Sequence, residues 1–387
     1  MQGKIVSYDT LLVGNPWKNW LFLRLTTDTG FEGFGEASLN GFVRTVDKAI
    51  SELQDYFMGK SAFEIGPMVR NMQSGVYSDG GQIHRGAIAA VEAACWDIVG
   101  KSLGQPLWNL WGGRVRDKIP LYANGWYQTE RDPEAFANKA KEAVAMGYRA
   151  LKFDPFGEAR GFLGTGERSR SLGIIRSVRD AVPAHTELMV EGHCRFDVPT
   201  ALLFARELQE FDVLWFEEPV SFRNLRGLVE VAQRSPVRIA TGENFTAFGE
   251  FFELCQASRN FVLQPDVSNL GGLMAARQVC ELGESLDVPV APHDAQGPIS
   301  KALCLQLAAI SPAIIIQEDF EEFNPEWTRQ LASRVDKHEG MATIPDSSGL
   351  GRTMYWEKLS EHPYDPGATL TLYEPGWEQR TGKRGLT

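Results

Sequence analysis

Residues 213–244, VLWFEEPVSFRNLRGLVEVAQRSPVRIATGEN, contain the pattern that decides the fold. One apolar run ends at Glu217, a second ends at Glu243, and the chain between them is long enough for a helix and two loops. A buried parallel strand has this continuous apolar character and is followed by a helix that returns the chain to the next strand. The segment therefore predicts a βα unit in which each strand ends in a carboxylate.

The same pattern recurs on both sides of this segment. Apolar runs also end at a charged or imidazole side chain in TELMVEGH (Glu191), FVLQPDV (Asp266), PVAPH (His293) and AIIIQED (Glu318). Consecutive members of the six are 23 to 27 residues apart, which is about the length of one βα unit. In a (β/α) barrel the carboxyl ends of the strands form the active-site face, so the pattern predicts one shared site.

Two further strands are expected before these six, IPLYANGW (119–126) and YRALKFDP (148–155), which gives eight strands of a parallel barrel. Residues 1–118 have a different character, because two strands joined by a turn at Gly30 are followed by helical patterns. This order is typical of an α+β unit. No good helix follows the last barrel strand, and we expect residues 326–387 to pack back on the N-terminal unit.

Composition limits the classes of function. Hydrophobic residues make up 43% of the 387-residue chain and charged residues 23%, as in soluble globular proteins. The net charge of −11 argues against binding to nucleic acid or to an anionic membrane surface. The sequence has no apolar run long enough to span a membrane, no signal-peptide core in MQGKIVSYDT, and five scattered cysteines, so we expect a cytoplasmic protein with reduced thiols.

Three carboxylates are predicted to converge. Glu191, Glu217 and Glu243 end three neighbouring strands, where unpaired carboxylates would repel one another. A hard divalent cation such as Mg²⁺ removes this conflict, since it prefers oxygen ligands and keeps positions open for substrate. The alternative for any one of them is a solvated loop carboxylate.

Two histidines are candidates for proton transfer. Asp266 and His293 end neighbouring strands, and a carboxylate that accepts from one imidazole nitrogen makes the other nitrogen a better base. His193 lies two residues after Glu191, so on a strand it would face the same site. It could ligate the metal or act as an acid, and the alternative is a structural histidine.

The remaining candidates are expected to contact the substrate. Lys152 and Asp154 in LKFDP would either face the site or form a buried ion pair. Glu318 could hydrogen-bond a substrate carboxylate, which would require a protonated side chain with a raised pKa. Trp17 in NPWKNW and His84 in YSDGGQIHRG are candidates in the N-terminal loops, with hydrophobic packing and helix entry as their alternatives.

These motifs resemble the enolase superfamily in its mandelate racemase-like branch, and the resemblance covers essentially the whole chain. WFEEP, TGEN, QPDVSNLGG and the APH before GPIS resemble the metal and dyad motifs of that branch. YANGWYQ, GYRALKFDPFG and the E-x-H-x-R-F string from Glu191 to Phe196 are most similar to gluconate/galactonate dehydratases. The resemblance implies an α/β fold, a (β/α)₇β modified TIM barrel over residues 119–325, with residues 1–118 as an α+β capping domain.

The resemblance also implies roles for the site residues. Mg²⁺ would be held at positions 191, 217 and 243, the His293–Asp266 dyad would take the proton next to a carboxylate, and Glu318 would hydrogen-bond that carboxylate. His193 would help the β-hydroxyl leave. The substrate would be a small sugar acid, and we expect the chain to form a homo-oligomer.

Two departures from the family pattern matter. Racemases of the branch carry Lys-x-Lys on the second strand, and here the second position is Asp154, which disfavours two-base racemisation. Glu191 replaces the more usual aspartate and lengthens that ligand by one methylene. The open alternatives are an epimerase or cycloisomerase on the same scaffold, and a catalytically silent metal-dependent sugar-acid binder.

Overall fold

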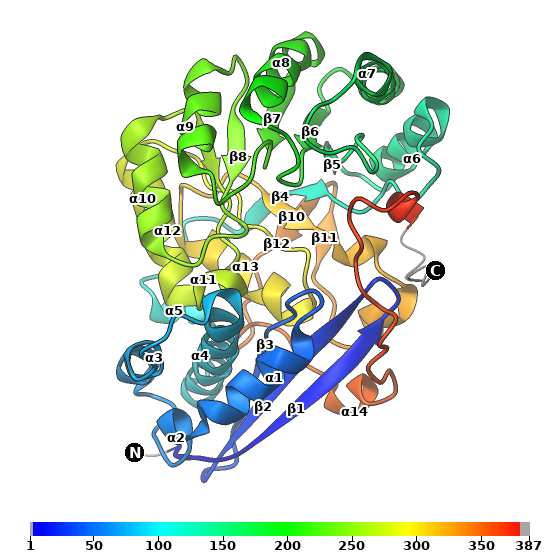
Figure 1. Ribbon diagram of the computed structural model, residues 1–387. Helices are drawn as coiled ribbons and strands as arrows, with labels where there is room; N and C mark the ends of the chain where they lie inside the picture. The colour runs from blue at the N-terminus through cyan, green and yellow to red at the C-terminus, as the bar shows by residue number, and fades with distance from the viewer. Residues whose placement is uncertain (1–2, 380–387) are drawn as a thin grey trace.

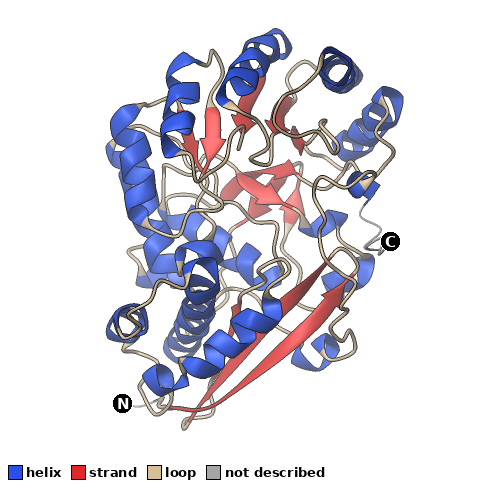
Figure 2. Ribbon diagram, in the orientation of Figure 1, coloured by secondary structure: helices blue, strands red, loops and turns tan. Residues whose placement is uncertain are grey.

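The computed structural model describes residues 3–379, and its N-terminal part is the expected α+β unit (Figures 1 and 2). A three-stranded antiparallel sheet in the order β1-β2-β3 packs against helices. The elements are β1 (Ile5–Asn15), β2 (Lys18–Thr27), β3 (Glu32–Glu36), α1 (Val43–Glu52), α2 (Gln54–Phe57), α3 (Ile65–Ser74), α4 (Gly81–Leu103) and α5 (Leu107–Leu110). The two strands predicted around Gly30 are β2 and β3, whereas β1 was not anticipated from the sequence.

Helix α4 lies directly on the backbone of β3. A Cβ atom built on Gly35 would lie only 2.0 Å from the carbonyl oxygen of Ala90, and one built on Gly33 would lie 2.0 Å from that of Ala94. The alternation of glycine with larger residues in EGFGE therefore serves helix packing on one face of the strand.

The second part of the chain is the predicted barrel of parallel strands surrounded by helices (Figure 1). Its strands are β4 (Lys118–Ala123), β5 (Ala150–Phe153), β6 (Glu187–Glu191), β7 (Val213–Glu217), β8 (Ile239–Thr241), β9 (Phe261–Leu263) and β10 (Gln317–Asp319). Strand β10 pairs with β4 and closes the barrel. The helical elements are α6 (Pro133–Ala145), α7 (Thr165–Ala181), α8 (Val198–Leu208), η1 (Gln209–Phe211), α9 (Leu225–Arg234), α10 (Phe248–Ala257), α11 (Val267–Leu270), α12 (Leu273–Ser285) and α13 (Pro298–Ile310).

The expected seventh barrel strand, PVAPH, is reduced to isolated parallel bridges. Val290 bridges to Leu263 on one side and to Ile314 on the other, and His293 bridges to Asp266. Pro289 and Pro292 have no backbone N–H to donate to a ladder, which explains why no regular strand forms here. The segment still occupies the seventh position, so His293 reaches the same end of the barrel as the other strand ends.

No regular α-helix directly follows β10 within the described residues, in agreement with the (β/α)₇β prediction. The chain continues through η2 (Glu321–Phe323), η3 (Glu326–Gln330), β11 (Lys337–His338), β12 (Met341–Thr343), α14 (Trp356–Leu359) and η4 (Trp377–Gln379). Strand β12 pairs with the first half of β4, so part of residues 326–387 packs on the barrel and not on the capping domain alone. The domain boundaries at 118/119 and 325/326 stay predictions.

A buried carboxylate of the capping domain holds the beginning of α13. Glu36 at the end of β3 accepts from the backbone N–H groups of Gly297 (2.6 Å), Ile299 (3.2 Å) and Ser300 (3.2 Å). The first N–H groups of a helix have no partner within the helix, and α13 has no side-chain cap of its own. Glu36 thereby attaches the capping domain to the loop that carries His293. Within residues 3–379, no helix combines the length and apolar character needed to cross a bilayer.

Candidate active site

Three carboxylates meet at the carboxyl ends of neighbouring strands. Glu191 on β6 is paired in register with Glu217 on β7, and Glu243 lies two residues beyond β8. One oxygen of each lies within 4.8 Å of the other two. Three carboxylates gathered in this way offer the oxygen donors that a hard divalent cation such as Mg²⁺ prefers.

Lys152 is the cation closest to this cluster among the described residues. Its ammonium group forms ion pairs with Glu217, with Glu318 at 3.1 Å and with Glu191 at 3.5 Å. Burial raises the pKa of Glu191 well above its usual value, and the charge of Glu217 adds to this effect. Burial also raises the pKa of Glu217, but Lys152 outweighs it and leaves the pKa lowered. The single positive charge of Lys152 does not balance the negative charges of the carboxylates around it, so the cluster can accept a further cation.

His293 and Asp266 form the expected dyad. The Nδ1 atom of His293 lies 2.7 Å from Oδ2 of Asp266, and Nε2 lies 3.4 Å from Oε2 of Glu243. An ionised carboxylate can only accept, so Nδ1 carries the proton and Nε2 is directed at the cluster. Burial lowers the pKa of His293, but the charges of Glu243, Glu318 and Asp266 outweigh it and raise this pKa to about 10.

His193 belongs to a second imidazole–carboxylate pair. Its Nδ1 atom lies 2.6 Å from Oδ2 of Asp154, and its backbone N–H donates to Glu191 at 2.6 Å. Asp154 also accepts from the guanidinium of Arg195 and from the N–H of Phe156.

The prediction that the two-residue period of a strand directs His193 into the site is wrong. Strand β6 ends at Glu191, and His193 (φ 44°) and Cys194 (φ 60°) have left-handed backbone conformations in a turn. The turn, and not the two-residue period of a strand, directs the imidazole into the site.

The expectation of a protonated Glu318 is also wrong. Burial raises its pKa, but Lys152 and His293 outweigh burial and lower the pKa to about 2. The carboxylate accepts from Nδ2 of Asn124 at 2.7 Å and from the backbone N–H of Asp294 at 2.6 Å. Glu318 is therefore ionised and fully buried, behind the surface that a substrate would touch.

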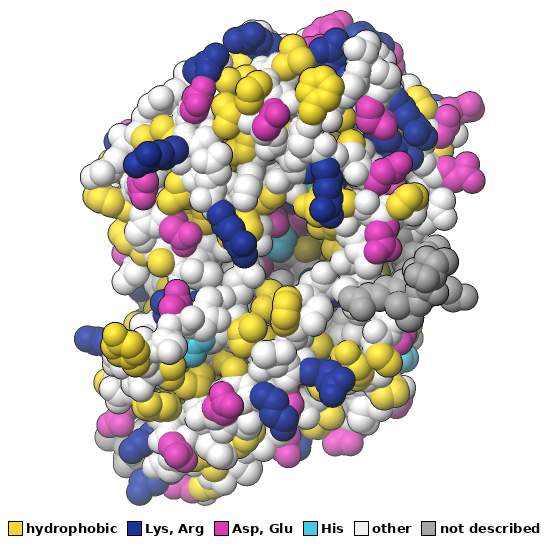
Figure 3. All heavy atoms as spheres, viewed as in Figure 1, with side chains coloured by type: hydrophobic (Ala, Val, Ile, Leu, Met, Phe, Trp, Pro, Cys, Tyr) yellow, Lys and Arg dark blue, Asp and Glu magenta, His cyan; other side chains and the backbone are white. Residues whose placement is uncertain are grey.

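A cavity of about 220 Å³ lies over this constellation, between the capping domain and the barrel. Figure 3 shows a hollow in the centre of the molecule with a histidine side chain visible inside it. The cavity is lined by both domains and by the C-terminal segment: Trp17, Lys18, Leu39, Asn40, Gln82, Asn124, Tyr127, Lys152, Glu191, His193, Glu243, Asn244, Asn269, His293, Ala295, Gln296, Phe320, Leu370, Leu372 and Trp377.

The structure brings most predicted residues to this cavity, but not all of them. Trp17 lines it, with Nε1 donating to Asn324 at 2.8 Å and its ring against Phe320. His84 does not line it, because its Nε2 atom lies 3.0 Å from the carbonyl oxygen of Met72 inside the capping domain. Asp154 has no exposed surface and lies behind His193, so it reaches a substrate only through that imidazole.

Sequence analysis missed a buried cation from the capping domain. Lys18 begins β2, and its ammonium group donates to Oε1 of Gln296 at 2.7 Å. Burial lowers the pKa of Lys18 to about 8, although Glu36 and Asp266 act in the opposite direction. The signal in the sequence is the lysine that stands beside Trp17 in the motif NPWKNW.

Asn124, Gln82 and the C-terminal residues Leu370, Leu372 and Trp377 were missed as well. Their positions depend on how distant parts of the chain pack together, and no local pattern marks them.

Two family models match the chain. Residues 16–112 match the mandelate racemase/muconate lactonizing enzyme N-terminal domain, and residues 135–358 match the enolase C-terminal domain-like family. The chain belongs to the mandelate racemase/muconate lactonizing enzyme family. The fold prediction and the family resemblance are thereby confirmed.

Three curated relatives of the chain are named as dehydratases. The chain is 31% identical to D-gluconate dehydratase of Thermoproteus tenax, over 94% of this chain and 74% of the relative. It is 29% identical to D-gluconate/D-galactonate dehydratase of Picrophilus torridus, over 94% and 93%. It is 33% identical to D-galactonate dehydratase of Cronobacter sakazakii, over 77% and 78%.

Solved structures of the family share the whole fold. The crystal structure of a mandelate racemase/muconate lactonizing enzyme from Jannaschia sp. CCS1 superposes with a TM-score of 0.86 at 29% identity, over 94% of this chain and 98% of that one. One from Sulfitobacter sp. superposes with a TM-score of 0.87 at 27% identity, over 97% and 98%.

Proposed function

We propose that this protein is a hydro-lyase that dehydrates a sugar acid, an aldonate such as gluconate or galactonate, to a 2-keto-3-deoxy acid. The observation that carries the proposal is that two histidine–aspartate pairs face one cavity that also contains a three-carboxylate cluster. Dehydration of a hydroxy acid needs one group to take the C2 proton and another to give a proton to the departing hydroxyl. The names of the relatives support this class of reaction.

We propose Mg²⁺ as the cation of the cluster, held by Glu191, Glu217 and Glu243. When bound, it supplies positive charge that stabilises the negative charge developing on the substrate carboxylate as the C2 proton leaves. The three carboxylates offer oxygen donors, and Glu191 and Glu217 share the single ammonium group of Lys152 with Glu318.

We assign the role of base to His293. Its Nδ1–H is held by Asp266, so Nε2 is the atom that would accept the C2 proton once a cation bound at Glu243 offsets the negative charge that raises the pKa of His293. Asp266 is held in turn by the backbone N–H of Asn269 at 2.9 Å, at the beginning of α11. The carboxylate then stabilises the imidazolium that forms.

We assign the role of acid to His193. Its Nδ1 faces Asp154, which leaves Nε2 to give a proton to the C3 hydroxyl. The C2–H and C3–O bonds break, a C2=C3 double bond forms, and water leaves. The resulting enol then tautomerises to the 2-keto-3-deoxy acid.

Lys152 and Asn124 would hold the substrate carboxylate, since both line the cavity. Ionised Glu318 acts through them, because it accepts from Asn124 and forms an ion pair with Lys152. Lys18 enters from the capping domain and would bind an oxygen of the substrate from the other side of the cavity.

Epimerisation of a sugar acid is the second candidate. The observation in its favour is that both imidazoles have an aspartate partner and both line the cavity, so each could exchange a proton with one face of a substrate carbon.

One experiment separates these proposals. A library of sugar acids is incubated in D₂O with the enzyme and Mg²⁺, and proton NMR follows both the C2 hydrogen and new 2-keto-3-deoxy products. A dehydratase forms the keto acid, an epimerase forms a deuterated isomer without loss of water, and a binder causes neither change. Failure of every sugar acid to yield a keto acid would refute the proposed reaction. The expected homo-oligomer and cytoplasmic location stay predictions.

A further inference from the structure

The C-terminal segment from residue 362 to residue 379, here named the C-terminal strap, is tied to the capping domain at its beginning. Asn19 on β2 donates to the carbonyl oxygens of Asp365 (2.7 Å) and Ala368 (2.9 Å) and accepts from the N–H of Asp365. Asn40 and the backbone of Leu370 form two hydrogen bonds of 3.1 Å with each other. Figure 1 shows the strap leaving the region of α14 and rising past the end of the β1–β2 hairpin toward the barrel.

The end of the strap lies on the barrel loops that follow β5 and β6. The hydroxyl of Tyr373 donates to the carbonyl oxygen of His193. Nε1 of Trp377 donates to the carbonyl oxygen of Gly157 at 3.1 Å. The Trp377 ring meets the His193 ring edge to face, with centroids 5.6 Å apart and an interplanar angle of 89°.

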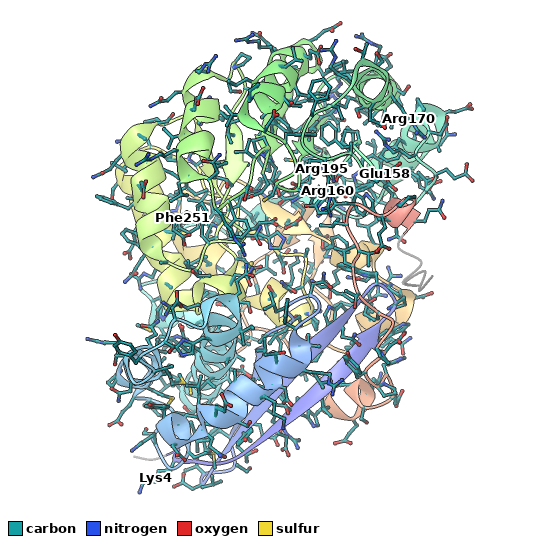
Figure 4. The ribbon with its side chains drawn as sticks, in the orientation of Figure 1. Lys4, Glu158, Arg160, Arg170, Arg195 and Phe251 are labelled. Atoms are coloured by element: carbon teal, nitrogen blue, oxygen red, sulfur yellow. The ribbon has the colours of Figure 1, made fainter. Side chains whose placement is uncertain are left out.

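Two arginines fasten Tyr373 against these loops. The guanidinium of Arg160 lies 3.9 Å from the centre of the Tyr373 ring, and that of Arg195 lies 5.0 Å from it. Figure 4 shows both arginines near the upper end of the strap. Arg195 also donates to Asp154, which is the partner of the His193 imidazole. Arg195 therefore contacts both Asp154, which holds the His193 ring, and Tyr373, which holds the His193 backbone carbonyl.

The strap also supplies part of the cavity wall. Leu370, Leu372 and Trp377 line the cavity, and all three lie beyond the family match, which ends at residue 358. The wall next to His193 therefore comes from a part of the chain outside the matched family domains.

His193 needs this support because its turn is conformationally unfavourable. His193 and Cys194 are consecutive non-glycine residues in the left-handed region, where side chains with a Cβ atom are disfavoured. Tyr373 itself has φ 79°. Such conformations persist only where the surroundings hold them. Here both residues joined by the Tyr373–His193 hydrogen bond have them.

We propose that Tyr373 and Trp377 are positioning residues that hold the His193 imidazole in the orientation needed to protonate the leaving hydroxyl. The inference rests on the proposed dehydration and assigns a role to the strap within it. Loss of a strap contact should therefore impair departure of the hydroxyl and leave removal of the C2 proton by His293 intact.

The test compares Tyr373→Phe with Tyr364→Phe. Both changes remove one hydroxyl from the same strap, and the Tyr364 hydroxyl has no hydrogen bond to any residue between 3 and 379. In D₂O, dehydration by Tyr373→Phe should fall roughly three- to tenfold, while C2–H exchange stays within about twofold of the native rate. Trp377→Phe should show the same imbalance, and Tyr364→Phe should show none.

A second measurement does not depend on the reaction. In protein labelled with ¹³C-histidine, the His193 ring signal is assigned by its loss in His193→Asn. A single sharp signal in the native protein should broaden or split in Tyr373→Phe and Trp377→Phe, and should stay unchanged in Tyr364→Phe.

An unchanged ratio of exchange to dehydration in Tyr373→Phe, an equal loss of both rates, or an unchanged His193 signal would each overturn the proposal. If the native enzyme dehydrates no sugar acid, the proposed function fails, and the His193 signal alone then decides whether the strap positions the imidazole.

Discussion

The two histidine–aspartate pairs of the cavity have the same local geometry and different surroundings. In each, Nδ1 lies within 2.7 Å of an aspartate oxygen, which leaves Nε2 for chemistry. Asp154 is neutralised by the guanidinium of Arg195, whereas Asp266 has no ion-pair partner other than His293 among the described residues. His293 also lies 3.4 Å from Glu243.

The difference teaches that two pairs of the same geometry can have different charges around them, and this difference underlies the separate roles proposed for them. More uncompensated negative charge surrounds His293, and its pKa is raised to about 10. This negative charge stabilises the imidazolium, which is the form that His293 has after accepting a proton. The aspartate of the His193 pair has an arginine partner as well, so the two imidazoles differ in the charges around them.

Removal of the metal should abolish the chemistry of both pairs, and this is the largest effect expected. Chelation should lower dehydration and C2–H exchange by about 10⁴-fold or more, because several kcal/mol of charge stabilisation are lost. Added Mg²⁺ should restore both. Glu217→Gln should behave like the chelated enzyme, with Glu230→Gln on the exposed face of α9 as its control. Native rates in chelated protein would show the metal assignment to be wrong.

Replacement of the proposed base, His293, should reduce both C2–H exchange and dehydration. His293→Asn should reduce both exchange and dehydration by about 10³- to 10⁴-fold, since no other group takes the C2 proton. The exposed His338, changed to Asn, provides the control. Exchange retained in His293→Asn would point to another base, with Lys152 as the first candidate.

Replacement of the proposed acid, His193, should reduce dehydration and leave C2–H exchange intact. His193→Asn should lower dehydration by about 10²- to 10³-fold and leave C2–H exchange near the native rate. Recovered substrate should then carry deuterium at C2 by NMR. Metal content must be measured in the same sample, because the His193 backbone contacts Glu191. Full dehydration activity in this variant would reduce His193 to a structural role.

Replacement of the two aspartates, Asp266 and Asp154, should change the reaction rates less than replacement of the histidines. Asp266→Asn should impair both reactions by about 10- to 100-fold, through loss of imidazole orientation and charge. Asp154→Asn should impair dehydration to a similar degree and spare exchange. It should also lower the melting temperature, because buried Arg195 loses its anionic partner. Equal effects of the two changes on exchange would remove the distinction between the pairs.

The smallest effect concerns pH and Lys18. Its pKa of about 8 means that the ammonium is charged below pH 8 and neutral above it. KM for an anionic sugar acid should therefore rise about tenfold between pH 7 and pH 9. Lys18→Arg should remove this rise, because arginine stays charged, and Lys18→Met should raise KM at every pH. An unaltered KM in Lys18→Met would exclude contact between this side chain and the substrate.

The sequence by itself determined the barrel and the meeting of its reactive residues. Apolar runs that end in Glu191, Glu217 and Glu243 predict strands, and parallel strands of one barrel end on the same face, so their terminal side chains must converge. The same reasoning brought His293 next to Asp266. These conclusions need only local periodicity and the geometry common to all such barrels.

Only the tertiary structure decided which charged groups meet and which charge state each group has. Asp154 pairs with His193 through a left-handed turn, Glu318 is ionised because Lys152 and His293 lie beside it, and Lys18 arrives from another domain. Partners of this kind are far apart in the chain, so no local pattern marks them. Their charge states depend on burial and on the summed field of neighbours, which exist only once the capping domain, barrel and C-terminal strap have packed together.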